Sequence, residues 1–168
     1  MILLNGASSS GKSSIAIELQ KQLPLPFWHI SIDHLRDAGV LPMDRIRSGE
    51  FDWANLRESF FIGFENSLRS YADSGNNLIV EYILEGPSQA KRFYQNIGSI
   101  DIFSVGVHCP LEELERREIS RGDRKIGDAK RDFGIVHRYN SYDFEVDSLQ
   151  PPVANAALIT TAWRAAHP

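Results

Sequence analysis

The residues Gly6 to Ser13 read Gly-Ala-Ser-Ser-Ser-Gly-Lys-Ser and fit the pattern G-x-x-x-x-G-K-[ST]. This pattern is typical of a loop whose backbone N–H groups surround nucleotide phosphates, with glycines where side chains would block the approach or φ must be positive. We expect Lys12 to reach the β- and γ-phosphates of ATP and Ser13 to place its hydroxyl on Mg²⁺. The predicted cofactor-binding residues here are Gly6, Ala7, Ser8, Ser9, Ser10, Gly11, Lys12, Ser13 and Ser14.

A carboxylate, Asp33, comes directly after the strand-like run from Trp28 to Ile32. Ligands of parallel sheets bind beyond the carboxyl ends of the strands, so Asp33 is expected at the same edge as the phosphate loop. It could act there as a general base that takes the proton of an acceptor hydroxyl, or as part of the Mg²⁺ shell. It could equally be the N-cap of a helix that starts at His34.

A second carboxylate, Glu81, lies inside the apolar run from Asn77 to Leu84. Burying a charge in such a run is costly unless the charge is paired or near a cation. We therefore predict that Glu81 holds the metal through a water molecule, with Glu85 as the less favoured substitute. The alternative is a partly exposed glutamate on an edge strand.

Four arginines and a lysine lie between Glu115 and Lys125, and Gly122 interrupts what would otherwise be one helix. This pattern favours a hinged lid over about residues 117–132. Guanidinium groups stabilise the charge that spreads over the oxygens of a phosphoryl group in transfer. Arg121 and Arg124, on either side of the glycine, are the predicted catalytic arginines. The alternative for this stretch is a solvated helix end with salt bridges to Glu115 and Glu118, which is what we expect for Arg116.

Strand-like runs that alternate with helical patterns must position these residues. The expected strands are 1–5, 28–32, 77–84, 100–107 and 144–147, and the expected helices are 11–23, 56–71, 88–96, 111–119, 128–137 and 152–166. Such alternation predicts an α/β fold, a three-layer α/β/α sandwich with a five-stranded parallel sheet. We expect one domain over 1–168, with an acceptor-binding region at about 34–58. The apolar side chains there, including Val40 and Trp53, could line a pocket or simply pack.

The composition describes an ordinary globular chain of 168 residues with a net charge of −4. That charge gives no general attraction to nucleic acid or to an anionic membrane, and we expect neither as a partner. Cys109 is the single cysteine and is expected in the core, which fits a reducing compartment, and no run is apolar enough to cross a membrane. We therefore expect a cytoplasmic protein, and a homo-oligomer stays open.

With these residues placed, the chain resembles the chloramphenicol phosphotransferase-like family of P-loop kinases. The likeness is carried by ILLNGASSSGKSS, ISIDHL with Asp33, REISRGDR, and VHRYNSYDFEVDS at 136–148. It implies a kinase that moves the γ-phosphoryl group of ATP to a hydroxyl of a small molecule, as in 3-O-phosphorylation of chloramphenicol. The catalytic base of the family corresponds to Asp33, its phosphate-binding lysine to Lys12, and the hydroxyl that binds Mg²⁺ to Ser13. Its lid arginines fall on Arg121 and Arg124, with Arg117 also matching.

Two other functions stay open at this stage. The first is a nucleoside, nucleotide or other metabolite kinase, since such enzymes share the loop and the lid. A phosphorylated acceptor would call for basic side chains near residues 34–58, and the chain offers Arg36, Arg45, Arg47 and Arg57. The second is a nucleotide-binding regulator without small-molecule turnover, which the retained lysine, serine, aspartate and lid arginines disfavour.

Overall fold

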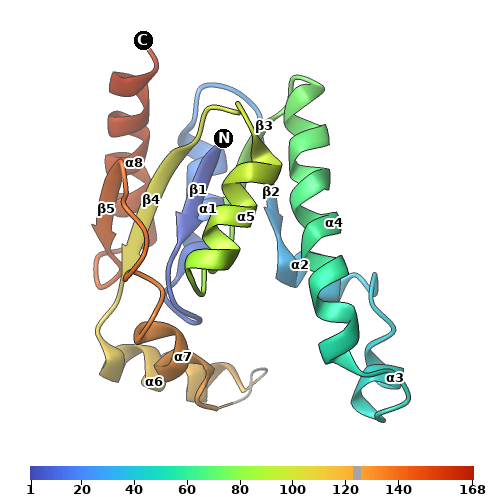
Figure 1. Ribbon diagram of the computed structural model, residues 1–168. Helices are drawn as coiled ribbons and strands as arrows, with labels where there is room; N and C mark the ends of the chain where they lie inside the picture. The colour runs from blue at the N-terminus through green and yellow to red at the C-terminus, as the bar shows by residue number, and fades with distance from the viewer. Residues whose placement is uncertain (123–125) are drawn as a thin grey trace.

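Five parallel strands form the centre of the protein in a computed structural model, which describes residues 1–122 and 126–168. Their order in the sheet is β2-β3-β1-β4-β5 (Figure 1). This confirms the expected α/β fold with a five-stranded parallel sheet. The strands are β1 (Ile2–Asn5), β2 (Phe27–Ser31), β3 (Asn77–Glu81), β4 (Phe103–His108) and β5 (Phe144–Asp147).

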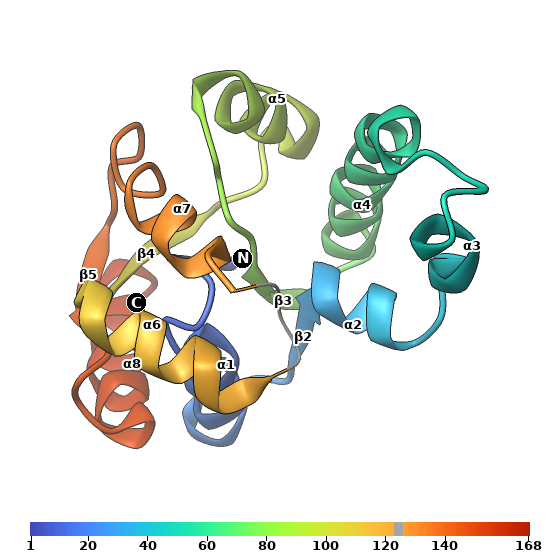
Figure 2. The same cartoon turned by 90° about the horizontal axis from the view of Figure 1, so that it is seen from below.

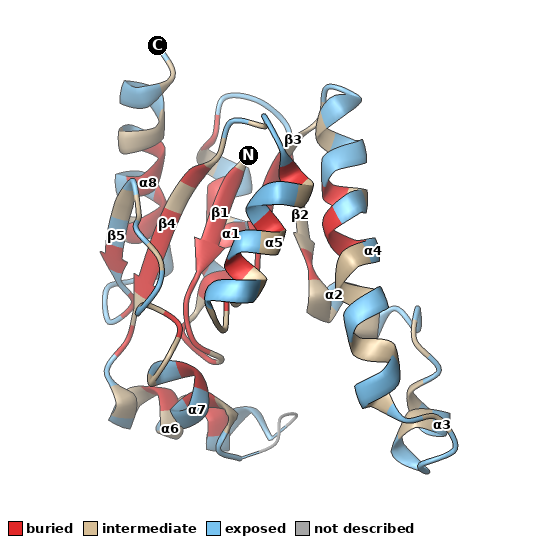
Figure 3. Ribbon diagram, in the orientation of Figure 1, coloured by how far each residue is buried: buried red, intermediate tan, exposed pale blue. Residues whose placement is uncertain are grey.

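Helices cover both faces of this sheet. On one face, α1 (Lys12–Gln22) and α8 (Pro152–Ala166) pack side chains such as Ile15 and Ile159 against Ile2 and Leu4 of β1. On the other, α4 (Trp53–Asp73) and α5 (Pro87–Ile97) cover the face that carries Leu3. Both faces of the central strands are therefore buried (Figure 3), which explains why they read as continuous apolar runs.

Four further helices lie beyond the carboxyl ends of the strands. One pair is α2 (Ile32–Asp37) and α3 (Met43–Arg47), which continues into the first turns of α4. The other pair is α6 (Leu111–Arg121) and α7 (Asp128–Phe133). Seen along the sheet from below, the two groups stand on opposite sides of the strand ends (Figure 2). The space between them is where a ligand of a parallel sheet is expected.

The structure differs from the local predictions in two helices. Helix α7 ends at Phe133 rather than His137, because the chain turns at Gly134. Helix α3 was not expected, since it is too short to show a helical period. The helix near His34, which the sequence offered as one alternative, is α2 and begins at Ile32. The expected helix 56–71 is part of α4, whose first turns extend past the sheet and have no buried side chain (Figure 3). Among the described residues, no helix is long and apolar enough to span a bilayer.

The chain leaves β1 at Gly6, and its backbone there lies so close to β4 that a side chain would not fit. A Cβ atom at Gly6 would lie 2.6 Å from the carbonyl oxygen of Val107 and 2.8 Å from Oγ of Ser10. Both distances are far below van der Waals contact, and the first involves backbone that cannot rotate away. Any side chain at this position would push the following loop off the neighbouring strand.

We therefore expect Gly6→Ala to lower the free energy of unfolding by about 1 to 3 kcal/mol, as overpacking generally does. Gly63→Ala is the matched control, because Gly63 lies within α4 and an added Cβ meets nothing within 4 Å. Alanine should leave stability there unchanged or raise it by up to about 1 kcal/mol. Urea denaturation of both variants measures the difference, and equal midpoints would contradict the packing argument.

Candidate active site

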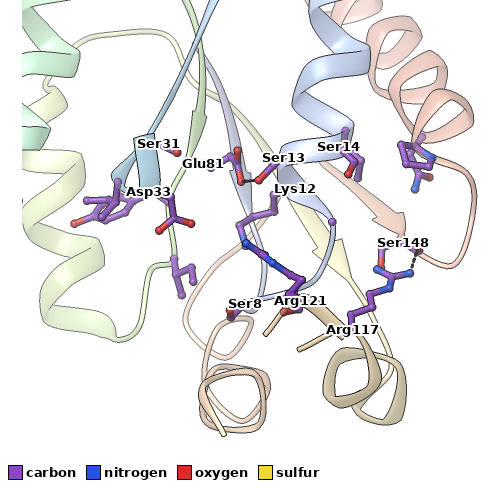
Figure 4. A pocket seen from close by; sticks show the side chains of 18 of the residues that line it. Ser8, Lys12, Ser13, Ser14, Ser31, Asp33, Glu81, Arg117, Arg121 and Ser148 are labelled. Carbon is purple, nitrogen blue, oxygen red and sulfur yellow. Dashed lines mark hydrogen bonds between the residues drawn. The ribbon is translucent and has the colours of Figure 1, made fainter. Parts of the chain in front are cut away.

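A cavity of about 750 Å³ opens at the carboxyl edge of the sheet. Predicted residues from the phosphate loop, β3 and α6 line it together (Figure 4). Gly6, Ala7 and Ser10 belong to the same loop but do not line the cavity, and Arg124 lies outside the described residues. The predicted residues that do line it are Ser8, Ser9, Gly11, Lys12, Ser13, Ser14, Asp33, Glu81, Glu85, Arg117 and Arg121.

The phosphate loop has the backbone and the donors that an anion requires. Gly11 has φ of 91° where α1 begins, and Ser9 has φ of 64°, which is uncommon for a residue with a side chain. The hydroxyls of Ser9 and Ser10 are buried, and within the described part of the chain neither has a hydrogen-bond partner. Such groups are costly unless a ligand or water satisfies them. Nucleotide phosphates therefore fit this loop.

Lys12 is folded back onto this loop. Its Nζ donates to the carbonyl oxygens of Gly6, at 2.9 Å, and Ala7, at 2.8 Å. An ammonium group held over the loop is close to any phosphate that the loop binds. A rotation of its flexible side chain would turn it from these carbonyls toward that phosphate.

Glu81 is the carboxylate at the centre of the site. Oγ of Ser13 donates to its Oε2 at 2.9 Å, and Nε2 of His29 lies 2.5 Å from its Oε1. Burial by itself would raise the pKa of Glu81. The hydrogen bond of His29, the charge of Lys12 and the hydroxyl of Ser13 outweigh burial and hold this pKa below its ordinary value. Glu81 is thus ionised at neutral pH, next to the hydroxyl predicted to bind the metal.

His29 was not found from the sequence, because one histidine inside a strand gives no sign of its partner. Its position on β2, directly across from Ile79 in the register of β3, brings its ring to the carboxylate at the end of that strand. The structure also distinguishes between Glu81 and Glu85, the two glutamates that the sequence offers for the metal. Glu85 lies beyond the strand and pairs with Arg57 at 2.8 Å instead of meeting Ser13.

Asp33 lies in the first turn of α2 and is not the N-cap of that helix. The cap is Ser31, whose hydroxyl accepts from the backbone N–H of His34 at 3.1 Å. Asp33 instead faces the cavity, and its Oδ1 lies 3.3 Å from a guanidinium nitrogen of Arg36. In Figure 4 it approaches Lys12 from the side of β2, while Arg121 approaches from the side of α6. Asp33 therefore does not serve as a helix cap.

Arg117 connects α6 to the phosphate loop and to the turn after β5. It donates to the carbonyl oxygen of Ser148 at 2.9 Å and to that of Ser10 at 3.4 Å. Hydrogen bonds from Arg116 and from Arg117 hold the pKa of Glu113 at about 2. This network holds α6 beside the loop.

Helix α6 is also bonded to the start of α7. Gly122 has φ of 67° and ends α6, as the sequence predicts. The buried carboxylate of Glu118 accepts from the backbone N–H groups of Gly127 and Ala129, each at 2.8 Å. Asp132 of α7, fully buried, accepts from the backbone N–H of Ser8 at 3.1 Å. Helix α7 therefore contacts the phosphate loop directly.

Asn5, the last residue of β1, holds three segments around the start of the phosphate loop. Its Oδ1 accepts from the backbone N–H of Leu84 at 3.1 Å. Its Nδ2 donates to the carbonyl oxygen of Val136 at 3.2 Å and to the hydroxyl of Tyr142 at 2.8 Å. Asn5 is almost fully buried, and the role of its side chain is to hold these three segments in position. Sequence reasoning missed it, because an asparagine before the loop carries no signal of its own.

The same network includes His137. Nδ1 of His137 lies 2.7 Å from the hydroxyl of Tyr142, and its ring stacks on that of His108 at 4.0 Å. Burial, together with the neighbouring His108, lowers the pKa of His137 to about 4. The imidazole is therefore neutral at neutral pH and packs as an uncharged ring. It does not line the cavity.

The lowered pKa of Glu81 predicts how stability depends on pH. Glu81 binds a proton less readily in the folded protein than in the unfolded chain, where its pKa is near 4.5. The ionised carboxylate therefore stabilises the folded state, and this stabilisation is complete above pH 4.5. It is lost as the pH falls through the folded-state pKa. We expect Glu81→Gln to cost about 1 to 3 kcal/mol at pH 7 and to flatten the loss of stability below pH 4.5.

Urea denaturation between pH 3 and pH 7 measures both effects. Glu58→Gln is the control, because Glu58 is an exposed glutamate on α4. It should leave both the midpoint at pH 7 and the acid slope close to those of the parent chain. If the unfolding free energy of Glu81→Gln falls below pH 4.5 as steeply as that of the parent chain, the carboxylate is not stabilised in its charged form.

Comparisons with known proteins agree with this geometry. A protein of Mycobacterium tuberculosis (strain ATCC 25618 / H37Rv) with the provisional name O-phosphotransferase is 31% identical over 181 residues, covering 94% of this chain and 78% of the relative. A sugar kinase from Janibacter sp. HTCC2649 has a TM-score of 0.69 at 14% identity and covers 97% of this chain and 93% of that one.

An APS kinase of Mycobacterium tuberculosis, solved with AMPPNP and APS, has a TM-score of 0.65 at 19% identity, with 97% and 96% of the two chains covered. At these identities the two structures confirm the P-loop kinase fold. The family described as chloramphenicol phosphotransferase-like protein matches residues 1–164. The chain therefore belongs to the chloramphenicol phosphotransferase-like family.

Proposed function

We propose that this protein is an ATP- and Mg²⁺-dependent O-phosphotransferase, which moves the γ-phosphoryl group of ATP to a hydroxyl of a small molecule. The observation that carries the proposal is the cavity in which the phosphate loop, the Ser13–Glu81 pair and Asp33 meet. Membership of the family and the kinase folds of its structural relatives support a small-molecule phosphotransferase.

The nucleotide half of the site uses the loop. Its backbone N–H groups and the hydroxyl of Ser9 bind the phosphates, and Lys12 turns from the loop carbonyls toward the β- and γ-phosphates. Ser13 would hold Mg²⁺ directly and Glu81 would hold it through water, which fits a hydroxyl and an ionised carboxylate 2.9 Å apart. The ion neutralises charge on the phosphate oxygens when it is bound.

The acceptor half uses Asp33. Its carboxylate accepts the proton of the acceptor hydroxyl as that oxygen forms a bond to the γ-phosphorus, while the bond from phosphorus to the β,γ-bridging oxygen breaks and ADP leaves. Arg121 of α6, together with Arg124, stabilises the charge on the transferred group, and Arg117 supports the nucleotide side. We place the acceptor beside α2 and the lid over about 117–132.

Asp33→Asn tests the proposed base. The change keeps the shape of the side chain but removes the proton acceptor, so we expect turnover to fall on the order of 10²- to 10⁴-fold while ATP binding stays close to that of the parent chain. The measurement is ATP consumption with Mg²⁺ across chloramphenicol, other hydroxyl-bearing antibiotics, nucleosides and sugars, together with calorimetric ATP binding.

Two variants complete this experiment. Asp37→Asn is the matched control, because Asp37 is exposed on the same helix and also pairs with Arg36. It should keep most of the activity. Lys12→Ala provides the blank. Full activity of Asp33→Asn with every acceptor would remove Asp33 as the base, and tight ATP binding without turnover of any small molecule would favour a nucleotide-binding regulator.

A further inference from the structure

The segment that follows β3, segment 82–85, lies where the two halves of the site meet. The phosphate loop follows β1 and Asp33 follows β2, and β3 lies between those two strands in the sheet. Three residues of the segment, Tyr82, Ile83 and Glu85, line the cavity. An acceptor hydroxyl that reaches Asp33 and a γ-phosphoryl group held by the loop therefore meet beside segment 82–85.

Side chains, rather than a backbone ladder, hold this segment. Its last backbone hydrogen bond to β1 is donated by Tyr82, and the described part of the chain gives residues 83–85 no hydrogen bond to another backbone atom. Gln89 of α5 takes this role. Its Oε1 accepts from the backbone N–H of Glu85 at 3.0 Å, and its Nε2 donates to the carbonyl oxygen of Ile83 at 3.3 Å. The position of segment 82–85 thus depends on how the amide of Gln89 is turned.

The Tyr82 hydroxyl fixes that orientation. Nε2 of Gln89 also donates to this hydroxyl, at 3.1 Å. An amide donates only through its nitrogen and accepts only through its oxygen. If the amide of Gln89 turned over, its nitrogen would face the N–H of Glu85 and its oxygen would face the carbonyl of Ile83, and both bonds would be lost. Tyr82 must therefore accept from Gln89, which requires its own proton to point elsewhere.

That proton points to Glu65, a fully buried residue of α4 that does not line the cavity. The Tyr82 hydroxyl donates to Oε1 of Glu65 at 2.8 Å. Arg92 donates to both oxygens, at 3.0 Å to Oε1 and at 3.1 Å to Oε2, and Asn96 donates to Oε2 at 2.7 Å. Ionised carboxylates are acceptors only. Donors from three side chains thus converge on Glu65, and the hydroxyl of Tyr82 has to donate to it.

We propose that Glu65 is a positioning residue for phosphoryl transfer. It fixes the direction of the hydrogen-bond chain through Tyr82 and Gln89, and this chain holds segment 82–85 in the conformation that receives the acceptor. The inference rests on the proposed function and adds to it a residue that touches neither substrate. The chain runs through α4 and α5, whereas the phosphate loop is held by α6 and α7. Use of the acceptor should therefore depend on Glu65, and the affinity for ATP should not.

Glu65→Gln tests the direction of the chain. The new amide keeps its bond to Nε of Arg92 if its oxygen takes the place of Oε2, and its nitrogen then faces Tyr82. The hydroxyl accepts from that nitrogen and donates to Gln89. The amide of Gln89 has to turn over in response, which releases the backbone N–H of Glu85.

Amide hydrogen exchange, followed by NMR, measures this release directly. We expect the exchange rate of Glu85, relative to that of Leu84, to rise on the order of 10-fold in Glu65→Gln. Leu84 is the internal reference, because its N–H donates to Asn5 and not to the chain that the variant reverses. This readout requires no acceptor.

A second variant moves the charge along the chain. In Gln89→Glu, the Tyr82 hydroxyl meets two carboxylates with one proton, so the chain is broken. In the double variant Glu65→Gln/Gln89→Glu, the hydroxyl accepts from the new amide at position 65 and donates to the new carboxylate at position 89, whose other oxygen accepts from Glu85. We expect each single variant to lower kcat/KM for the acceptor on the order of 10-fold and the double variant to recover most of that loss, with the Kd for ATP unchanged in all three.

The acceptors for this measurement are chloramphenicol and the other compounds of the panel above that the parent chain phosphorylates. Leu68→Ala is the matched control, because Leu68 is fully buried on α4 and does not line the cavity. It should lower stability but leave the exchange ratio and kcat/KM at the parent values wherever it is folded. If Glu65→Gln does not fold, as judged by circular dichroism, Tyr82→Phe interrupts the same chain while it keeps the ring, and it should change both quantities in the same direction.

The outcomes separate this inference from the proposed function. If both single variants keep the exchange ratio and kcat/KM of the parent chain, or if the double variant is no better than the product of the two single losses, Glu65 does not set the direction of the chain. A loss of ATP affinity as large as the loss of kcat/KM would also overturn the inference, because the effect would then extend to the whole site. If the parent chain phosphorylates no compound of the panel, the proposed function fails, and the exchange ratio still decides whether Glu65 holds segment 82–85.

Discussion

A buried carboxylate must be balanced by donors and positive charge, and Glu81 imposes this requirement on the whole active site. Its two oxygens are used by different parts of the chain, one by Ser13 of α1 and the other by His29 of β2. The contact to α1 fixes the first turn of the helix on which the phosphate loop ends. The contact to β2 fixes the strand that leads into Asp33. One side chain thus sets the distance between the nucleotide side and the acceptor side of the cavity.

The two groups of helices at the strand ends are held in different ways. Arg117 of α6 and Asp132 of α7 bond to main-chain atoms of the phosphate loop, and Glu118 of α6 bonds to main-chain atoms at the start of α7. Helices α2 and α3 extend beyond the sheet with the first turns of α4, have no buried side chain and carry ion pairs (Figure 3). The side proposed to bind phosphate is therefore closely packed, whereas the side proposed for the acceptor rests on surface contacts, which contribute little stability.

Most of the fold could be predicted because apolar runs and helical spacing report burial directly. The phosphate loop followed from four residue types at fixed spacing, and the interruption at Gly122 from a single residue. Helix α3 could not be predicted, and α2 entered only as one alternative for Asp33, since the conformation of both depends on contacts such as the Ser31 cap and the Arg45–Glu50 pair. His29, Asn5 and the orientation of Glu85 were inaccessible for the same reason: their partners lie 52, 79 and 28 residues away.

The contacts of Asn5 also bear on the order in which the protein can form during synthesis. Residue 5 is translated before its partners, which follow it by 79, 131 and 137 positions in the chain. Contacts of such long separation form slowly and only once both partners exist. The start of the phosphate loop is therefore translated well before the residues that hold it in place. A nascent chain carries the sequence of this loop until Tyr142 has been made, and only then can all three contacts of Asn5 form.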